Sequence, residues 1–158
     1  MSLPRNLPPA QPAPELLALF ESPDRLPAAI RRQAEFFVFF ARTIFPLLES
    51  YRVRLAPLYC AHQGRPAWDP VRLLGVLILQ FVLRVPDRQA AEAVQYDQRW
   101  RLALHLPPAE AAFDPSLRVV FRGRLLESGE EKLAFTAVLD SLVEQGWVPK
   151  RSRQRLDW

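Results

Sequence analysis

The 158-residue sequence has only one cysteine, two histidines and five glycines. The single cysteine, Cys60, excludes an internal disulfide and a four-cysteine zinc site. Cys60 and His62 together would supply only two of the four ligands that a zinc site needs. Neither His62 nor His105 belongs to a pattern typical of a hydrolytic triad, and the glycines lack the spacing of a nucleotide-binding loop. We therefore expect no cofactor, no metal site and no small-molecule substrate.

Long apolar runs are missing as well. The longest, residues 71–83, is interrupted by Arg72 and Gln80 and is shorter than the roughly 20 residues that a membrane helix needs. The first 14 residues are polar and rich in proline, unlike a secretory signal. With 49% hydrophobic and 24% charged residues, the composition is typical of one globular domain. We expect a cytoplasmic protein with no membrane partner.

Lysine is scarce, because 19 of the 21 basic residues are arginine. The net charge is +4 over 27–83, +2 over 84–124, −4 over 125–146 and +3 over 147–158. A basic body and tail favour a polyanionic partner, with the acidic segment turned away from it. Arginine also favours two-pronged contacts with phosphate or guanine. A GC-rich genome would produce the same bias, so both interpretations stay open.

Prolines and capping residues divide the chain into helices. Seven of the sixteen prolines lie in the first 27 residues, which predicts a disordered tail over 1–26 with a helical turn only near 15–20. A long helix is predicted from Pro27, kinked or ended by Pro46, and another from an Asp69 cap to about Leu83. Further helices are predicted at 86–94, 100–104, 115–127 and 130–145. No segment alternates at period two, so the predicted fold is all-α.

This pattern predicts one compact helical domain over 27–148, followed by a basic tail over 149–158. The stretch 86–104, a short helix, a turn and a second helix, fits a helix-turn-helix with Ala91 at the helix contact. A three-helix packing unit with no role in DNA binding has the same pattern, because Gln95 and Tyr96 occupy a turn where glycine is typical. Trp100 is predicted to be a core residue rather than a platform for stacking bases.

Three groups of basic residues are candidate DNA contacts. They are Arg99 and Arg101; Arg118, Arg122 and Arg124; and the tail residues Lys150, Arg151, Arg153 and Arg155. Arg118 and Arg122 share one helix face, whereas Arg124 lies about 200° round from Arg122. Ion pairs with acids of the last helix, and for the tail a merely solubilising role, are the alternatives. Four positive charges within six residues would bind phosphates whatever the base sequence.

Several segments in a fixed order resemble the amino-terminal, InsH-type domain of bacterial insertion-sequence transposases of the DDE class. They cover about residues 59–157. The matching segments are Gly64-Arg65-Pro66 with Asp69-Pro70, then Asp87-Arg88-Gln89-Ala90-Ala91-Glu92-Ala93-Val94, Trp100 with Ala103-Leu104, Phe113-Asp114 with Ser116, Phe121-Arg122 with Arg124-Leu125-Leu126-Glu127 and Gly129, and Gly146 before Gln154-Arg155 with Asp157. The resemblance implies recognition of an element's terminal repeats.

The sequence departs from this family pattern in three places. His105 stands where the family usually has glycine, and Arg118 stands where an apolar residue is expected. Asp157 matches the first catalytic carboxylate of the family, but the two other carboxylates do not follow it before Trp158. Two-metal phosphoryl transfer needs the complete set of carboxylates around its Mg²⁺ ions. We therefore expect a truncated transposase domain with no catalytic residues of its own, and Mg²⁺ only in an intact family member.

The predicted function is thus that of a helical DNA-binding module, associated with the nucleoid. Arg122 is the first candidate for a DNA contact, and Arg99, Arg101 and Arg88 follow. The alternative is a protein-interaction remnant that pairs with itself or with an intact transposase without binding DNA. Its surface would be the aromatic cluster between Phe36 and Phe40, for which burial in the core is the preferred interpretation.

Overall fold

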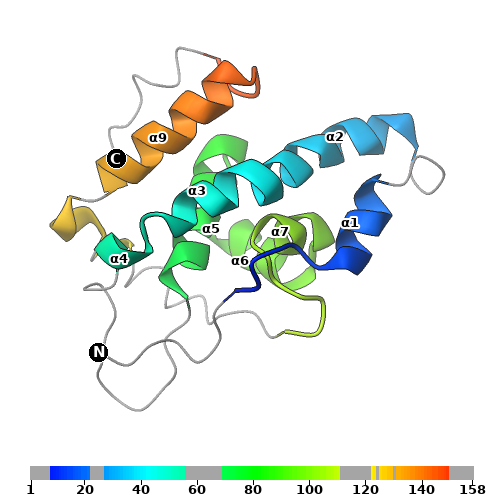
Figure 1. Cartoon of the computed structure of the whole chain (residues 1–158), viewed down its shortest axis with the longest axis horizontal. Helices are drawn as coiled ribbons and strands as arrows, with labels where there is room; N and C mark the ends of the chain where they lie inside the picture. The colour runs from blue at the N-terminus through cyan, green and yellow to red at the C-terminus, as the bar shows by residue number, and fades with distance from the viewer. Residues whose placement is uncertain are drawn as a thin grey trace.

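The protein was analysed as a computed structural model that describes residues 8–21, 27–55, 69–110, 122–123, 125–129 and 131–149. Every regular element within these ranges is helical, which confirms the all-α fold. The elements are α1 (Pro14–Glu21), α2 (Ala28–Phe39), the π-helix η1 (Phe40–Ile44), α3 (Phe45–Glu49), α4 (Arg52–Leu55), α5 (Pro70–Leu83), α6 (Asp87–Tyr96), α7 (Gln98–Ala103) and α9 (Glu131–Glu144) (Figure 1). Residues 122–123 and 125–128 are also helical.

The long helix predicted from Pro27 runs through α2, η1 and α3 without a break. Pro46 does not end it, because the chain widens into a π-helix just before the proline and the Phe45 N–H donates to the Phe40 carbonyl. In that register the partner of the Ala41 carbonyl would be residue 46, and proline has no N–H to donate. Instead, the ring of His105 approaches this carbonyl, with Nε2 at 2.6 Å from it.

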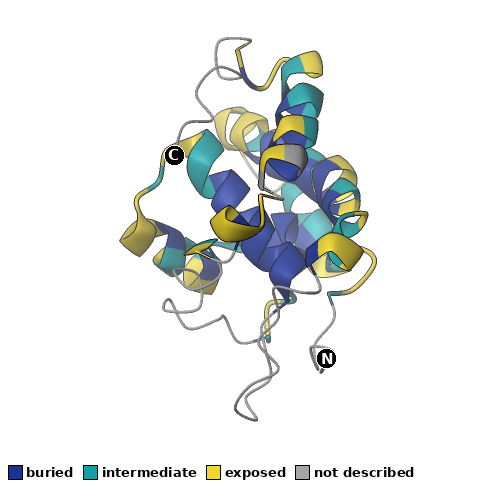
Figure 2. Cartoon of the chain, turned by 90° about the vertical axis from the view of Figure 1, so that its left-hand side faces the viewer, coloured by how far each residue is buried: buried dark blue, intermediate teal, exposed yellow. Residues whose placement is uncertain are grey.

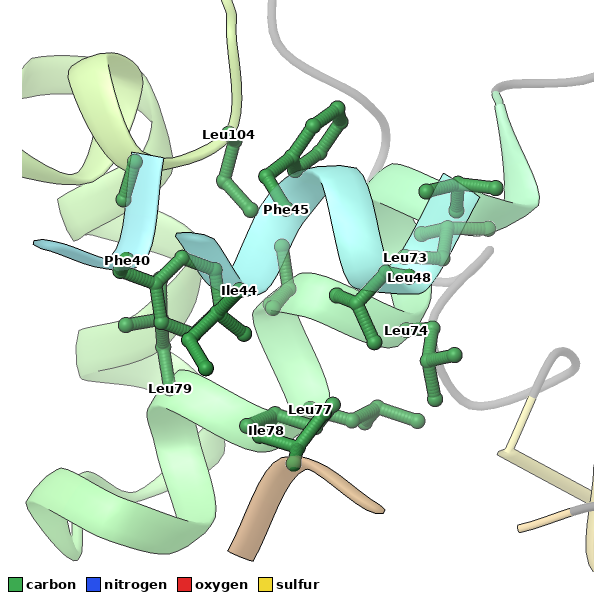
Figure 3. Packing of buried hydrophobic residues seen from close by; sticks show 14 of the residues in the cluster. Phe40, Ile44, Phe45, Leu48, Leu73, Leu74, Leu77, Ile78, Leu79 and Leu104 are labelled. Atoms are coloured by element: carbon green, nitrogen blue, oxygen red, sulfur yellow. The ribbon is translucent and has the colours of Figure 1, made fainter. Parts of the chain in front are cut away.

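Helix α5 begins and ends where the sequence predicts. The Asp69 side chain accepts a hydrogen bond from the Arg72 N–H at 3.1 Å, and Pro70 is the first helical residue. Its residues 70–79 are all buried, so α5 is the centre of the bundle (Figure 2). Leucine and isoleucine side chains of α5 pack against Phe40, Ile44, Phe45 and Leu48 of the long helix (Figure 3).

Gly75 lies where α5 approaches the chain after α7 most closely. A Cβ atom there would come within 2.7 Å of the Leu104 side chain and would also contact Leu48 and Phe40. Because real Cβ atoms do not tolerate so short a distance, glycine permits this packing. The position fixes α5 against both the long helix and the Leu104 segment.

The aromatic cluster of α2 is inside the protein, which confirms the preferred interpretation. Phe36, Phe37 and Phe40 are buried, and Phe36 packs edge-on against Trp147 with ring centroids 5.6 Å apart. Trp147 follows the last helix and therefore ties it to α2. The protein-interaction alternative is left without the exposed aromatic face on which it depended.

Helix α1 (Pro14–Glu21) confirms the helical turn predicted near 15–20, whereas the described residues 8–21 do not form the disordered tail that was predicted around it. Helix α1 packs against the body, where Leu16 forms a small apolar cluster with Ala41 and Leu102. The carbonyl of Pro9 also lies 2.9 Å from Nδ1 of His105. Proline content predicted flexibility, but residues 8–21 lie against the body because they cover apolar side chains of two helices. Residues 1–7 and 22–26 lie outside the described part of the chain.

The last helix, α9, matches its prediction closely. Its stripe of Phe135, Val138, Leu139 and Leu142 is buried, and Gly146 takes a φ of +78° just after the helix, as a carboxy-terminal cap requires. Figure 1 shows α9 on the other side of α3 from α6 and α7. The start of the helix predicted at 115–127 and the tail from residue 150 lie outside the described residues.

Candidate nucleic-acid interface

The turn between α5 and α6 carries a network of three polar side chains. Gln80, near the end of α5, donates through Nε2 to the Asp87 carboxylate at 2.5 Å. Arg122, which has helical backbone, donates to the same carboxylate at 3.2 Å and to Oε1 of Gln80 at 3.4 Å. The Arg122 side chain is 32% exposed. The first candidate for a DNA contact is therefore held at the surface by an acid on α6.

Two further arginines lie at this turn. Arg84 is exposed and takes the left-handed conformation, with φ of +54°, that ends α5. Arg88, in the first turn of α6, has a side chain that is 93% exposed, with Glu92 at 3.9 Å as an ion-pair partner. An exposed pair of this length contributes little to stability. Arg84, Arg88 and Arg122 form what we call the turn cluster.

Arg99 lies at the other end of α6. Its guanidinium donates to both carboxylate oxygens of Asp97, at 3.0 and 2.7 Å, and lies over the ring of Phe37. The hydrogen bond to Asp97 raises the pKa of Arg99 against the opposing effect of burial. The side chain is 36% exposed, so its outer edge remains open to a phosphate.

Arg101, another predicted DNA contact, points inward instead. It is only 5% exposed, and it donates to the carbonyls of Gln95, Pro107 and Glu110 at 3.2, 3.0 and 2.8 Å. Burial lowers its pKa, a direction that Glu110 opposes and Arg72 reinforces. The geometry gives Arg101 a structural role, in which it satisfies the carbonyls of the segment after α7.

Arg72 on α5 also donates to backbone carbonyls after α7, although it was not among the residues predicted from the sequence. Its side chain is fully buried and donates to the Leu104 carbonyl at 3.2 Å, the His105 carbonyl at 2.6 Å and the Glu110 carboxylate at 2.8 Å. The signal was present in the sequence, because Arg72 interrupts an apolar helix. Two buried arginines thus hold the segment 104–110, in which the interior carbonyls of Leu104 and His105 would otherwise lose a donor.

His105 is part of this buried structure. Its φ is +52°, the backbone conformation that favours glycine, which is the residue that the family resemblance gives at this position. Its ring stacks on Phe45 at 4.2 Å and lies between the carbonyls of Ala41 and Pro9. A neutral ring can donate to only one of these two oxygens at a time.

The helix-turn-helix predicted over 86–104 is not confirmed. Helices α6 and α7 are joined through Asp97 alone, whose side chain caps α7 by accepting from the Arg99 N–H at 2.9 Å. Residues 100–103 of α7 are all buried, Trp100 among them as predicted. A helix buried in this way cannot enter a DNA groove.

The other candidate residues lie outside the described part of the chain: Arg118, Arg124, Lys150, Arg151, Arg153, Arg155 and Asp157, together with Cys60 and His62. Among the described residues, no three histidine, cysteine or acidic side chains are grouped to hold a metal ion. Within the same ranges, no helix has the length and apolar character to cross a membrane.

Comparisons with known proteins add one assignment to this geometry. A search of curated proteins and of solved structures finds no match. The family model described as "Transposase domain (DUF772)" matches residues 26–124, more than half of the chain. It includes α2 and the turn cluster, and it starts well before residue 59, where the sequence resemblance began. The chain therefore belongs to the DUF772 transposase domain family.

Proposed function

We propose that this domain binds duplex DNA at the terminal repeats of an insertion element, as the recognition module of a transposase. The observation that carries the proposal is the turn cluster. Arg84 ends α5, Arg88 lies in the first turn of α6, and Arg122 is paired with Asp87 of that same turn, so all three lie at or beside the α5–α6 turn of a transposase-family domain. Arginine suits this task because its planar fork binds phosphate oxygens in pairs.

In this proposal the turn cluster and Arg99 contact the phosphate backbone. Arg118, Arg124 and the basic residues of 150–155 extend the contact surface. The acidic α9 lies away from the duplex, consistent with its place across α3 from α6. Arg101 is left out, because its buried side chain already donates to partly buried carbonyls of the protein itself.

Salt dependence is the direct test. Binding of a fluorescent 30-base-pair duplex is followed by anisotropy at several salt concentrations, and log affinity should fall steeply with log salt because counterions leave the phosphates. Replacing Arg88 and Arg122 together by alanine should flatten the slope by up to about 0.9 for each phosphate that is no longer neutralised. Lys132→Ala on α9 removes one exposed positive charge elsewhere and should leave the slope unchanged. Absence of binding at low salt would contradict the proposal.

The proposal covers binding without strand cleavage by these 158 residues alone. Asp157 is the one family carboxylate that the resemblance identifies in the sequence, and two-metal cleavage needs several. Incubation of the protein–DNA complex with Mg²⁺ should leave end-labelled strands intact on a denaturing gel. Nicks that depend on Mg²⁺ and on Asp157 would overturn this part.

A further inference from the structure

We infer that α6 is the helix that enters the major groove and reads bases, through an outer face formed by Arg88, Gln89, Glu92, Gln95 and Tyr96. This inference rests on the proposed DNA binding and adds the element and the chemistry that select a sequence. It replaces the arrangement predicted from the sequence, in which α7 followed α6 as the second helix of a helix-turn-helix.

The packing of α6 leaves this face open. Ala90 and Val94 are fully buried against the body, and at 100° per residue their common direction lies opposite Glu92. The five residues of the outer face fall within about 120° around Glu92 by the same geometry. All five are exposed, Tyr96 to 72%.

Size also fits. A helix with its side chains is about 10–12 Å across, and the major groove of B-form DNA is about 12 Å wide. Helix α6 has ten residues and is therefore about 15 Å long. Because only Ala90 and Val94 of α6 are buried, most of the helix surface is exposed and available to a groove.

The side chains of the outer face match base edges rather than phosphates alone. Arginine pairs with guanine O6 and N7, glutamine with adenine N6 and N7, and glutamate accepts from the cytosine amino group. Glu92 is the informative residue, because a carboxylate at the centre of a face that met only phosphates would be repelled by them. In the groove the same carboxylate faces amino donors, so its position favours base reading.

Positive charges lie at both ends of α6, where the groove walls would be. Arg84 and Arg122 lie at its amino-terminal end, and Arg99 lies just beyond its carboxy-terminal end. Phosphate contacts at the two ends of a helix fix its depth and direction in the groove without reading sequence. Asp87 and Asp97 neutralise part of this charge, but arginines still outnumber acids at the two ends, with base-reading groups between them.

The test uses selection from a pool of duplexes that carry a randomised 20-base-pair centre. The full chain is expected to enrich a defined motif. The variant Gln89→Ala/Gln95→Ala should weaken the preference at one or two base pairs of that motif by about 5- to 150-fold each, with an unchanged salt slope on random duplex. Gln145→Ala, another exposed glutamine outside α6, is the matched control and should select the wild-type motif.

A variant that changes the preferred base distinguishes base reading from a purely structural role of Gln89. Gln89→Arg should shift one position of the motif from adenine to guanine, which a structural role for Gln89 would not produce. The far-ultraviolet circular dichroism melt of each variant should match that of the wild type, since both glutamines are exposed. If wild type and variants enrich the same motif, or the wild type binds without any preference, the inference fails while DNA binding stands. If the wild type binds no duplex at all, the proposed function fails and the inference fails with it.

Discussion

Arginines on neighbouring helices of this domain have opposite tasks. Arg72 and Arg101 point into the protein and hold the carbonyls of 104–110, whereas Arg84 and Arg88 point into solvent from the turn before α6 and its first turn. The difference arises because Arg72 lies beside the buried carbonyls of Leu104 and His105, and Arg101 lies beside partly buried carbonyls farther along the same irregular segment. The comparison teaches that a count of arginines near a DNA-binding segment does not give the number of DNA contacts.

Among the substitutions that distinguish buried from exposed arginines, replacement of Arg72 should cause the largest loss of stability. Arg72→Met fills part of the space but leaves the Glu110 carboxylate and two buried carbonyls without their partner, so we expect a loss of about 3–5 kcal/mol in unfolding free energy. Urea denaturation followed by circular dichroism measures it. Arg72→Lys keeps the charge without the fork and should recover only part of the loss. A loss below about 1 kcal/mol, the usual effect of a surface substitution, would show that the 104–110 segment is held by other contacts.

Arg101 and Arg88 separate the two tasks directly. Arg101→Ala should cost about 1–2 kcal/mol of stability, because three partly buried carbonyls lose their donor. It should leave the salt slope of DNA binding unchanged in the folded protein. Arg88→Ala should change stability by less than about 0.5 kcal/mol and reduce the slope by about 0.9. The paired measurements are urea denaturation and anisotropy titration of the same two samples. An Arg101 variant that folds normally but binds DNA with a flatter salt slope would reverse the assignment.

Local sequence signals predicted most of the helices, because capping and periodicity act over a few residues. Asp69 with Pro70, and Gly146 after α9, mark helix ends that the structure reproduces. The Pro46 signal was ambiguous, because it does not show that the chain forms a π-helix before the proline, nor that His105, 64 residues from Ala41, lies against the Ala41 carbonyl. The direction of Arg101 likewise depends on a distant backbone segment. Contacts across the fold decide such cases, and the sequence pattern around each residue does not contain them.

Substitutions of His105 test how its buried ring and its left-handed backbone conformation each affect stability. His105→Ala removes the ring from Ala41, Pro9 and Phe45 and keeps a side chain at φ +52°, whereas His105→Gly removes the same ring without that strain. The glycine variant should therefore be more stable than the alanine variant by about 1 kcal/mol. Thermal unfolding of the two variants side by side measures this difference. Equal stability would mean that residue 105 leaves the left-handed conformation once the ring is gone.

Replacing Asp87 should have the smallest effect, and it tests how the exposed arginines of the turn cluster bind DNA. Its carboxylate holds Arg122 and Gln80, but in a complex it would also face the phosphates that the turn cluster binds. Asp87→Asn keeps an oxygen for Arg122 and removes the negative charge, so DNA should bind about 2- to 5-fold more tightly at low salt, a gain below about 1 kcal/mol. Anisotropy titration at two salt concentrations measures the gain, which screening should reduce at high salt. Weaker binding by this variant would show instead that the carboxylate is needed to position Arg122, because a neutral amide then fails to hold the guanidinium toward the duplex.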